Sequence, residues 1–130
     1  MEKHFVTYNQ ALALKELGFD EPCIARYIIP GDLVFKGCYE DSNIIHLELT
    51  QNDICEAHVL APLKSQVFKW FRENHSIHGI VSYYGKGQWN IEILDYKGNE
   101  LIQIEDNTFW SYEEAESACI DELIELLQNK

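Results

Sequence analysis

The chain has 130 residues and a formal net charge of −12, with 46% apolar and 12% aromatic residues. This length and composition fit one folded domain, residues 1–130, and exclude an intrinsically disordered chain. The negative charge argues against direct binding to nucleic acid and to anionic membranes, because both require a basic protein surface. No run of 18 apolar residues occurs, which excludes a transmembrane helix.

The compartment is predicted from the first ten residues and from the cysteines. The stretch MEKHFVTYNQ lacks the apolar segment of a signal peptide, so we expect a cytoplasmic protein. The four cysteines include no CxxC pair, and in that compartment they are expected to be reduced and buried. Disulfide pairing is the alternative. The cysteines are Cys23, Cys38, Cys55 and Cys119.

The first third of the chain predicts one helix followed by three strands. Thr7 and Gln10 have the spacing of a capping box, and Gly18 supplies the left-handed residue that ends a helix. We expect Phe19 to pack back on Leu14. Three short β-branched or aromatic runs follow, and turn-forming residues separate them. These runs are CIARYII (23–29), LVFKGC (33–38) and NIIHLEL (43–49).

The rest of the chain predicts a second helix, three more strands and a third helix. Pro62 stands at the favoured first position of a helix over 62–75, and Ser111 and Glu114 form a capping box for a helix over 111–130. Between them lie three strand-like runs, at 79–84, 88–96 and 100–105. The order α-βββ-α-βββ-α predicts an α+β fold, a mostly antiparallel sheet with helices packed on it.

Catalytic and metal signatures are weak in this sequence. It contains no nucleophile elbow, phosphate-binding loop, HExxH helix or dinucleotide fingerprint, so we predict no catalytic residues and no cofactor. Cys55-x-x-His58 and His75-x-x-His78 offer zinc ligands of permitted types, but their separation fits no zinc signature. We therefore predict a buried thiol and surface histidines, and no metal site.

The stretch SYYGKGQWN, residues 82–90, has two interpretations. Gly85-Lys86-Gly87 is typical of a hairpin turn, because glycine adopts positive φ without strain. The alternative is an anion-binding loop, since residues 61–90 hold four lysines or arginines against a single glutamate in an otherwise acidic chain. Helical spacing places the other three cations on one flank of the second helix.

If the hairpin lies beside that helix, cations and aromatic rings would form a pocket for a nucleotide. The cations would bind phosphate, and the rings would stack on a base. Solvation of an exposed helix face is the alternative for the cations. The predicted ligand-binding residues are Lys64, Lys69, Arg72, Lys86, Tyr84, Trp89 and Trp70.

Three blocks of the sequence resemble a group of small uncharacterised proteins of bacteriophages and bacterial mobile elements. The blocks are QALALKELGFDEPC, APLKSQVFKWFRE and SYEEAESACIDELIELL. The resemblance implies a shared fold, and a role in blocking host components or in sequestering the small nucleotide signals of host defence. The last helix also resembles that of a double-stranded-RNA-binding domain, but acidic residues replace its basic cluster, which excludes RNA binding.

The function predicted from the sequence is that of a non-enzymatic binding protein, a phage counter-defence factor that sequesters a small anionic, nucleotide-type ligand. A homo-oligomer is expected, because a short chain builds a deeper pocket at an interface. The second hypothesis is an acidic inhibitor that binds a host protein or mimics nucleic acid, acting through its negative charge. The third is a small hydrolase without a recognised motif.

Overall fold

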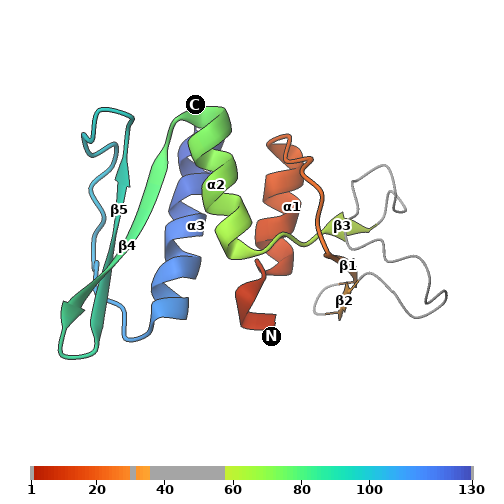
Figure 1. Ribbon diagram of the computed structural model, residues 1–130, viewed down its shortest axis with the longest axis horizontal. Helices are drawn as coiled ribbons and strands as arrows, with labels where there is room; N and C mark the ends of the chain where they lie inside the picture. The colour runs from red at the N-terminus through yellow and green to blue at the C-terminus, as the bar shows by residue number, and fades with distance from the viewer. Residues whose placement is uncertain (1, 30–31, 36–57, 130) are drawn as a thin grey trace. The chain divides into compact units, whose positions relative to one another are not determined.

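The computed structural model describes residues 2–29, 32–35 and 58–129 (Figure 1). The chain divides into two compact units, Met1–Leu63 and Lys64–Lys130. Some of the sequence predictions concern residues outside the described ranges. They are the strand at 43–49, the end of the strand at 33–38, and the cysteines Cys38 and Cys55.

The first unit begins with a short 3₁₀ turn, η1 (Glu2–His4), and helix α1 (Tyr8–Glu16). The predicted capping box is present: the Gln10 N–H donates to Thr7 Oγ1 (3.2 Å), and the Thr7 N–H donates to Gln10 Oε1 (3.0 Å). At the other end Gly18 has a φ of 95°, and the Phe19 N–H donates to the Leu14 carbonyl (2.9 Å). Local spacing alone therefore predicted both ends of this helix.

Three short strands complete the described part of this unit. Strands β1 (Ala25–Ile29), β2 (Asp32–Phe35) and β3 (Val59–Leu60) form an antiparallel sheet in the order β2-β1-β3. The Tyr27 hydroxyl joins this sheet to the N-terminal segment by donating to the Val6 carbonyl (2.6 Å). Its ring meets that of Tyr8 edge to face, with centroids 5.6 Å apart.

The second unit contains helix α2 (Lys64–His75), the hairpin strands β4 (His78–Gly85) and β5 (Gln88–Leu94), and helix α3 (Tyr112–Gln128) (Figure 1). Strands β4 and β5 pair antiparallel, with Val81 opposite Ile91 and Gly79 opposite Ile93. Ser111 Oγ caps α3 by accepting the Glu114 N–H (3.1 Å). The Glu114 carboxylate accepts the N–H of Trp110 (3.2 Å), one residue before the cap.

Both helices of this unit pack on one face of the hairpin, and both come very close to Gly79. A Cβ atom at Gly79 would lie 2.8 Å from Phe68 Cε1 of α2, and 2.9 Å from Cys119 Sγ and 3.0 Å from Leu123 Cδ1 of α3. By strand alternation Val81 and Tyr83 share the face of Gly79. The core of the unit therefore lies between this face and the two helices.

The predicted strand at 100–105 is replaced by an irregular segment that follows the outer edge of β5. Only isolated bridges form there, between Leu94 and Glu100 and between Trp89 and Phe109. Asn107 occupies the middle of the edge: its Nδ2 donates to the Ile91 carbonyl and its Oδ1 accepts the Ile91 N–H, both at 2.8 Å. A side-chain amide thus replaces strand backbone. The α+β class and the antiparallel pairing with packed helices are confirmed.

Candidate functional site

The predicted cations do not converge on one point. Lys64 is buried at the first position of α2, whereas Lys69 and Arg72 are exposed further along the helix. Lys86 stands at the tip of the hairpin. Since a strand rises about 3.3 Å per residue, Lys86 lies about 20 Å along the hairpin from Gly79, where α2 meets β4. The structure therefore does not bring Lys86 to Arg72.

The Gly85-Lys86-Gly87 segment is a hairpin turn, as the first interpretation predicted. Its three residues have positive φ, of 103°, 57° and 78°. The Gly87 N–H donates to the hydroxyl oxygen of Tyr83 (3.0 Å), so a donor that an anion loop would use has a protein acceptor. The turn joins the two strands at the end of the hairpin remote from Arg72.

The predicted stacking residues lie in three different surroundings. The Tyr84 ring is 58% exposed, on the face of β4 that points away from the helices. Trp89 is half-buried, with its ring 4.9 Å from that of Tyr83 and 5.2 Å from that of Tyr112. Trp70 is buried, and its ring contacts those of Phe71 and His75.

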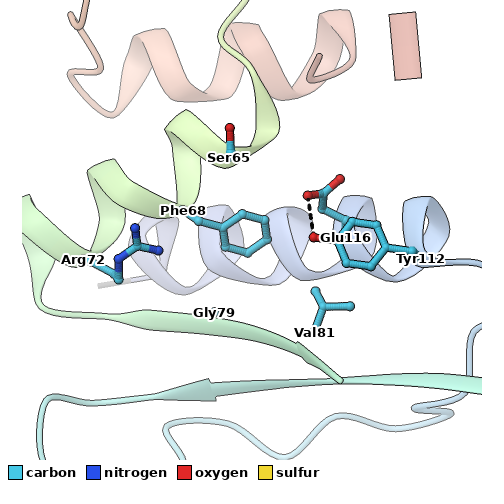
Figure 2. Close-up of a pocket in the computed structure, with 7 residues that line it drawn as sticks. All are labelled: Ser65, Phe68, Arg72, Gly79, Val81, Tyr112 and Glu116. Atoms are coloured by element: carbon cyan, nitrogen blue, oxygen red, sulfur yellow. Dashed lines mark hydrogen bonds between the residues drawn. The ribbon is translucent and has the colours of Figure 1, made fainter. Parts of the chain in front are cut away.

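A hollow of about 270 Å³ lies between α2, α3 and β4, and we call it the helix-side hollow (Figure 2). Arg72 stands at one end, Tyr112 and Glu116 at the other, and the Phe68 ring lies between them. Val81 projects into it from β4. Its lining comprises Ser65, Phe68, Arg72, Gly79, Val81, Tyr112 and Glu116.

Glu116 is a carboxylate with only 9% of its surface exposed, and it accepts a hydrogen bond from the Tyr112 hydroxyl (3.1 Å). Burial, and then the charge of Glu116, raise the pKa of Tyr112 above its ordinary value. Tyr112 therefore stays a hydrogen-bond donor through neutral pH. The helix-side hollow has a guanidinium at one end and a carboxylate at the other.

A second hollow of about 370 Å³ also has Arg72 in its lining, and we call it the outer hollow. It combines a guanidinium, an imidazole and an exposed tyrosine ring with the backbone of the turn after β5. Its lining comprises Arg72, His78, Gly79, Ile80, Leu94, Asp95, Tyr96 and Gly98. Arg72 and Gly79 line both hollows, so Arg72 is the one predicted ligand residue that borders either of them.

Asp95 organises the turn at the edge of the outer hollow. Its Oδ1 accepts the N–H groups of Lys97 and Asn99, each at 2.9 Å. The Asn99 N–H is the main reason that the pKa of Asp95 lies below its ordinary value. This turn leaves Tyr96 72% exposed and places Lys97 Nζ 5.6 Å from the centre of the Tyr96 ring. An ammonium thus stands beside an accessible aromatic ring.

Sequence reasoning did not select Glu116, Tyr112, His78 or Tyr96 as site residues. Glu116 carried a signal, because it lies three residues before Cys119 and four before Ile120, on the apolar stripe of α3. A carboxylate at such a position needs a partner or a function. Tyr96 had only a weak signal, an aromatic residue immediately before the turn residues KGN.

The histidine part of the zinc hypothesis has a simple structural context. His75 contacts the rings of Trp70 and Phe71, and His78 begins β4. In the part of the chain that the structure describes, no group of three or more His, Cys, Asp or Glu residues has the geometry of a metal site. Among the same residues, no helix combines the length and apolar character needed to span a membrane.

Comparison with protein-family models, with curated proteins and with solved structures finds no match to this chain. The resemblance to phage and mobile-element proteins therefore stays a prediction, and the function has to be argued from the site itself.

Proposed function

We propose that this protein is a non-enzymatic binding protein that holds a small anionic, nucleotide-type ligand in the outer hollow. The observation that supports this most is the position of Arg72, an exposed guanidinium on the wall of both hollows. A guanidinium binds phosphate through two parallel hydrogen bonds, which fixes the orientation of the anion as well as its position.

The other groups of the outer hollow suit the remaining parts of such a ligand. Tyr96 presents an accessible ring on which a base can stack, and Lys97 beside it adds a second positive charge. His78 is a further donor for phosphate oxygens. A volume of about 370 Å³ lies at the lower end of the range for ligand pockets, which favours a mononucleotide over a larger compound.

The use of the carboxylate supports a binding role over catalysis. Asp95 accepts two backbone N–H groups of its own turn, and these bonds stabilise its ionised form. A general base takes up a proton near neutral pH, which requires a raised pKa, and Asp95 has the opposite shift. Its role in this proposal is to shape the turn that presents Tyr96 and Lys97.

The test is the thermal stability of the purified protein against mononucleotides, cyclic nucleotides, nucleosides and pyrophosphate. A ligand at 100 times its Kd stabilises the folded state by about 2.7 kcal/mol, which raises Tm by several degrees. Nucleosides lack the phosphate and pyrophosphate lacks the base, so each should give a smaller shift than the matching nucleotide. The compound should be recovered intact, because turnover would favour the hydrolase hypothesis.

Matched variants locate the binding site. Arg72→Ala should abolish the shift, whereas Lys69→Ala, an exposed cation on the same helix, and Lys86→Ala at the hairpin tip should retain it. Tyr96→Ala should weaken nucleotides more than pyrophosphate, because only nucleotides contain a base. The proposal is wrong if no compound stabilises the protein, or if Arg72→Ala leaves the shift unchanged.

The second candidate, an acidic inhibitor that binds another protein, is favoured by the carboxylates of α3. Asp121 and Glu125 are exposed on this helix, and Glu122 lies between them in the sequence. Burial first, and then the charges of Glu125 and Asp121, raise the pKa of Glu122. Such a concentration of charge would steer a basic partner. Asp121→Asn with Glu125→Gln should weaken that activity and leave nucleotide binding intact.

A further inference from the structure

The two edges of the β4–β5 hairpin have different hydrogen-bond partners. On β5 the edge groups belong to Trp89, Ile91 and Ile93, because these residues bond away from β4. Trp89 exchanges two bonds with Phe109 (2.8 and 2.9 Å), and the Ile93 carbonyl accepts the Leu101 N–H (2.9 Å). Ile91 is paired with the Asn107 amide. The chain itself therefore covers the edge of β5.

The same register shows which groups of β4 point outward. In an antiparallel pair, opposite residues either both bond across the ladder or both point away from it. Gly79, Val81 and Tyr83 are opposite Ile93, Ile91 and Trp89, so their N–H and C=O groups point away from β5. In the described part of the chain, β4 pairs with β5 alone, and these three residues have no other backbone partner.

The open edge of β4 borders the helix-side hollow. Gly79 and Val81 line the hollow, α2 forms its opposite wall, and α3 lies behind it (Figure 2). An extended segment along this edge would bond to the backbone of β4. Every second side chain of that segment would point toward the hollow. The hollow has an apolar middle at Phe68, with Arg72 and Glu116 at its two ends.

The space beside β4 suits a single strand better than a second copy of the chain. Phe68 of α2 approaches Gly79 from the same face as Cys119 and Leu123 of α3, so α2 lies in the helix layer. A second hairpin paired to β4 would bring its own helices into that layer, where α2 already lies. A peptide without a helix layer avoids this conflict.

We infer that the open edge of β4 binds an extended peptide by strand addition, with an acidic side chain opposite Arg72. A second peptide side chain, basic or hydroxyl-bearing, would meet Glu116 and the Tyr112 hydroxyl at the other end of the hollow. This surface shares Arg72 with the proposed nucleotide site, but it also uses the backbone of Val81 and Tyr83 and the buried carboxylate of Glu116, which do not line the outer hollow.

The test begins with selection from a displayed library of random dodecapeptides on the full-length protein, without nucleotide present. Selected peptides should carry Asp or Glu at one fixed position, and Arg72→Glu should change that preference to Lys or Arg. Glu116→Gln should relax the preference for a basic residue at the second position. A swapped preference cannot arise from loss of folding, so the outcome is specific to these side chains.

A second measurement tests strand addition directly. The best peptide is resynthesised with a single N-methyl group at each backbone amide in turn. Methylation at alternate positions should weaken binding about tenfold, because each affected N–H bonds to β4, while the positions between should change little. Peptide binding should also slow amide hydrogen exchange at Val81 and Tyr83 and leave exchange at Ile91 unchanged.

Three outcomes would overturn the inference. The first is a selection that yields no peptide binding above background. The second is binding that N-methylation weakens without alternation along the peptide. The third is self-association of the protein, measured by sedimentation, that protects Val81 and Tyr83 without any peptide, which would make a second copy the occupant.

Discussion

The two edges of the β4–β5 hairpin belong to one strand pairing, but only the edge of β5 has hydrogen-bond partners elsewhere in the described chain. Along β5, outward backbone groups hydrogen-bond to three other residues: to the backbone of Phe109, to the side-chain amide of Asn107 and to the backbone N–H of Leu101. Along β4, the structure describes no such cover. Proteins usually protect an exposed strand edge, because it can pair with another chain.

The difference indicates where this protein is available for binding. The covered edge contributes to stability, and the open edge lies beside a hollow with charged groups at both ends. Both hollows meet at Arg72, so one side chain separates the proposed nucleotide site from the proposed peptide groove. The following changes test the comparison, from the largest expected effect to the smallest.

Gly79→Val should have the largest effect, because it forces side-chain atoms into the contact between β4 and both helices. A Cβ alone would lie under 3.0 Å from Phe68 Cε1 and Cys119 Sγ. We expect a loss of about 3 kcal/mol in unfolding free energy, measured by urea denaturation. Ser82→Val, which by alternation lies on the opposite face of β4, is the control and should change stability by about 0.5 kcal/mol or less. Equal costs would contradict the packing described for Gly79.

Asn107→Ala should uncover the middle of the β5 edge. It removes two 2.8 Å hydrogen bonds and leaves the Ile91 N–H and C=O without this partner. The expected cost is about 2 kcal/mol by denaturant unfolding, together with faster hydrogen exchange at the Ile91 amide. Thr108→Ala, at the next and exposed position, is the control. If exchange at Ile91 stayed as slow as in the parent protein, Asn107 would not be the group that protects this edge.

The pKa of the Cys119 thiol measures how well water is excluded from the space between β4 and α3. Burial raises the pKa of this thiol from about 9 in the unfolded chain to about 12 in the folded protein. The stabilisation from the protonated thiol is therefore complete below pH 9 and is lost as the pH rises toward 12. Between pH 9 and pH 10 this should remove about 1 kcal/mol of unfolding free energy.

The control for the thiol is Cys119→Ala, measured by urea unfolding at the same two pH values. Tyr112 also has a raised pKa, and both proteins retain it, so the difference between their pH slopes isolates the thiol. Parallel slopes would mean that solvent reaches the sulfur and that its pKa is ordinary.

Val81→Pro should have the smallest effect, because the N–H that proline removes points away from β5 and has no described backbone partner. We expect a loss of about 1 kcal/mol or less, since proline is tolerated at sheet edges. Ile80→Pro is the matched comparison, one residue earlier. Its N–H bonds across the ladder toward Glu92, and its loss should cost about 3 kcal/mol. Similar costs at both positions would show that the edge of β4 is not open.

Much of the fold was accessible from local sequence patterns. The α+β class, the capping of α1 by Thr7, the capping of α3 by Ser111 and the hairpin turn at Lys86 were all predicted and are confirmed. These features depend on residues within about four positions of one another. The segment 100–105 was predicted wrongly as a strand, because its apolar residues resemble one while its neighbours provide only isolated bridges.

The candidate site was less accessible, because its members come from α2, α3, β4 and the turn after β5. Arg72 was selected from its charge, but the sequence grouped it with Lys86, which lies at the far end of the hairpin. Its neighbours at the two hollows include Glu116 on α3, and His78 and Tyr96 at the open end of the hairpin, where β4 begins and β5 has ended. No spacing rule relates residues 72, 96 and 116, because local spacing does not fix the course of the chain between residues so far apart in the sequence.

The sequence by itself determined where α1 and α3 begin, which stretches pair as a hairpin and how negative the chain is, whereas α2 begins at Lys64 and not at the predicted Pro62. Each of these follows from interactions between near neighbours or from a simple sum of charges. Only the tertiary structure decided that Gly79 lies against two helices, that Asn107 covers one hairpin edge and that the other edge has no backbone partner among the described residues. Those outcomes depend on which surfaces meet when the helices pack, and such long-range contacts leave no regular period in the sequence.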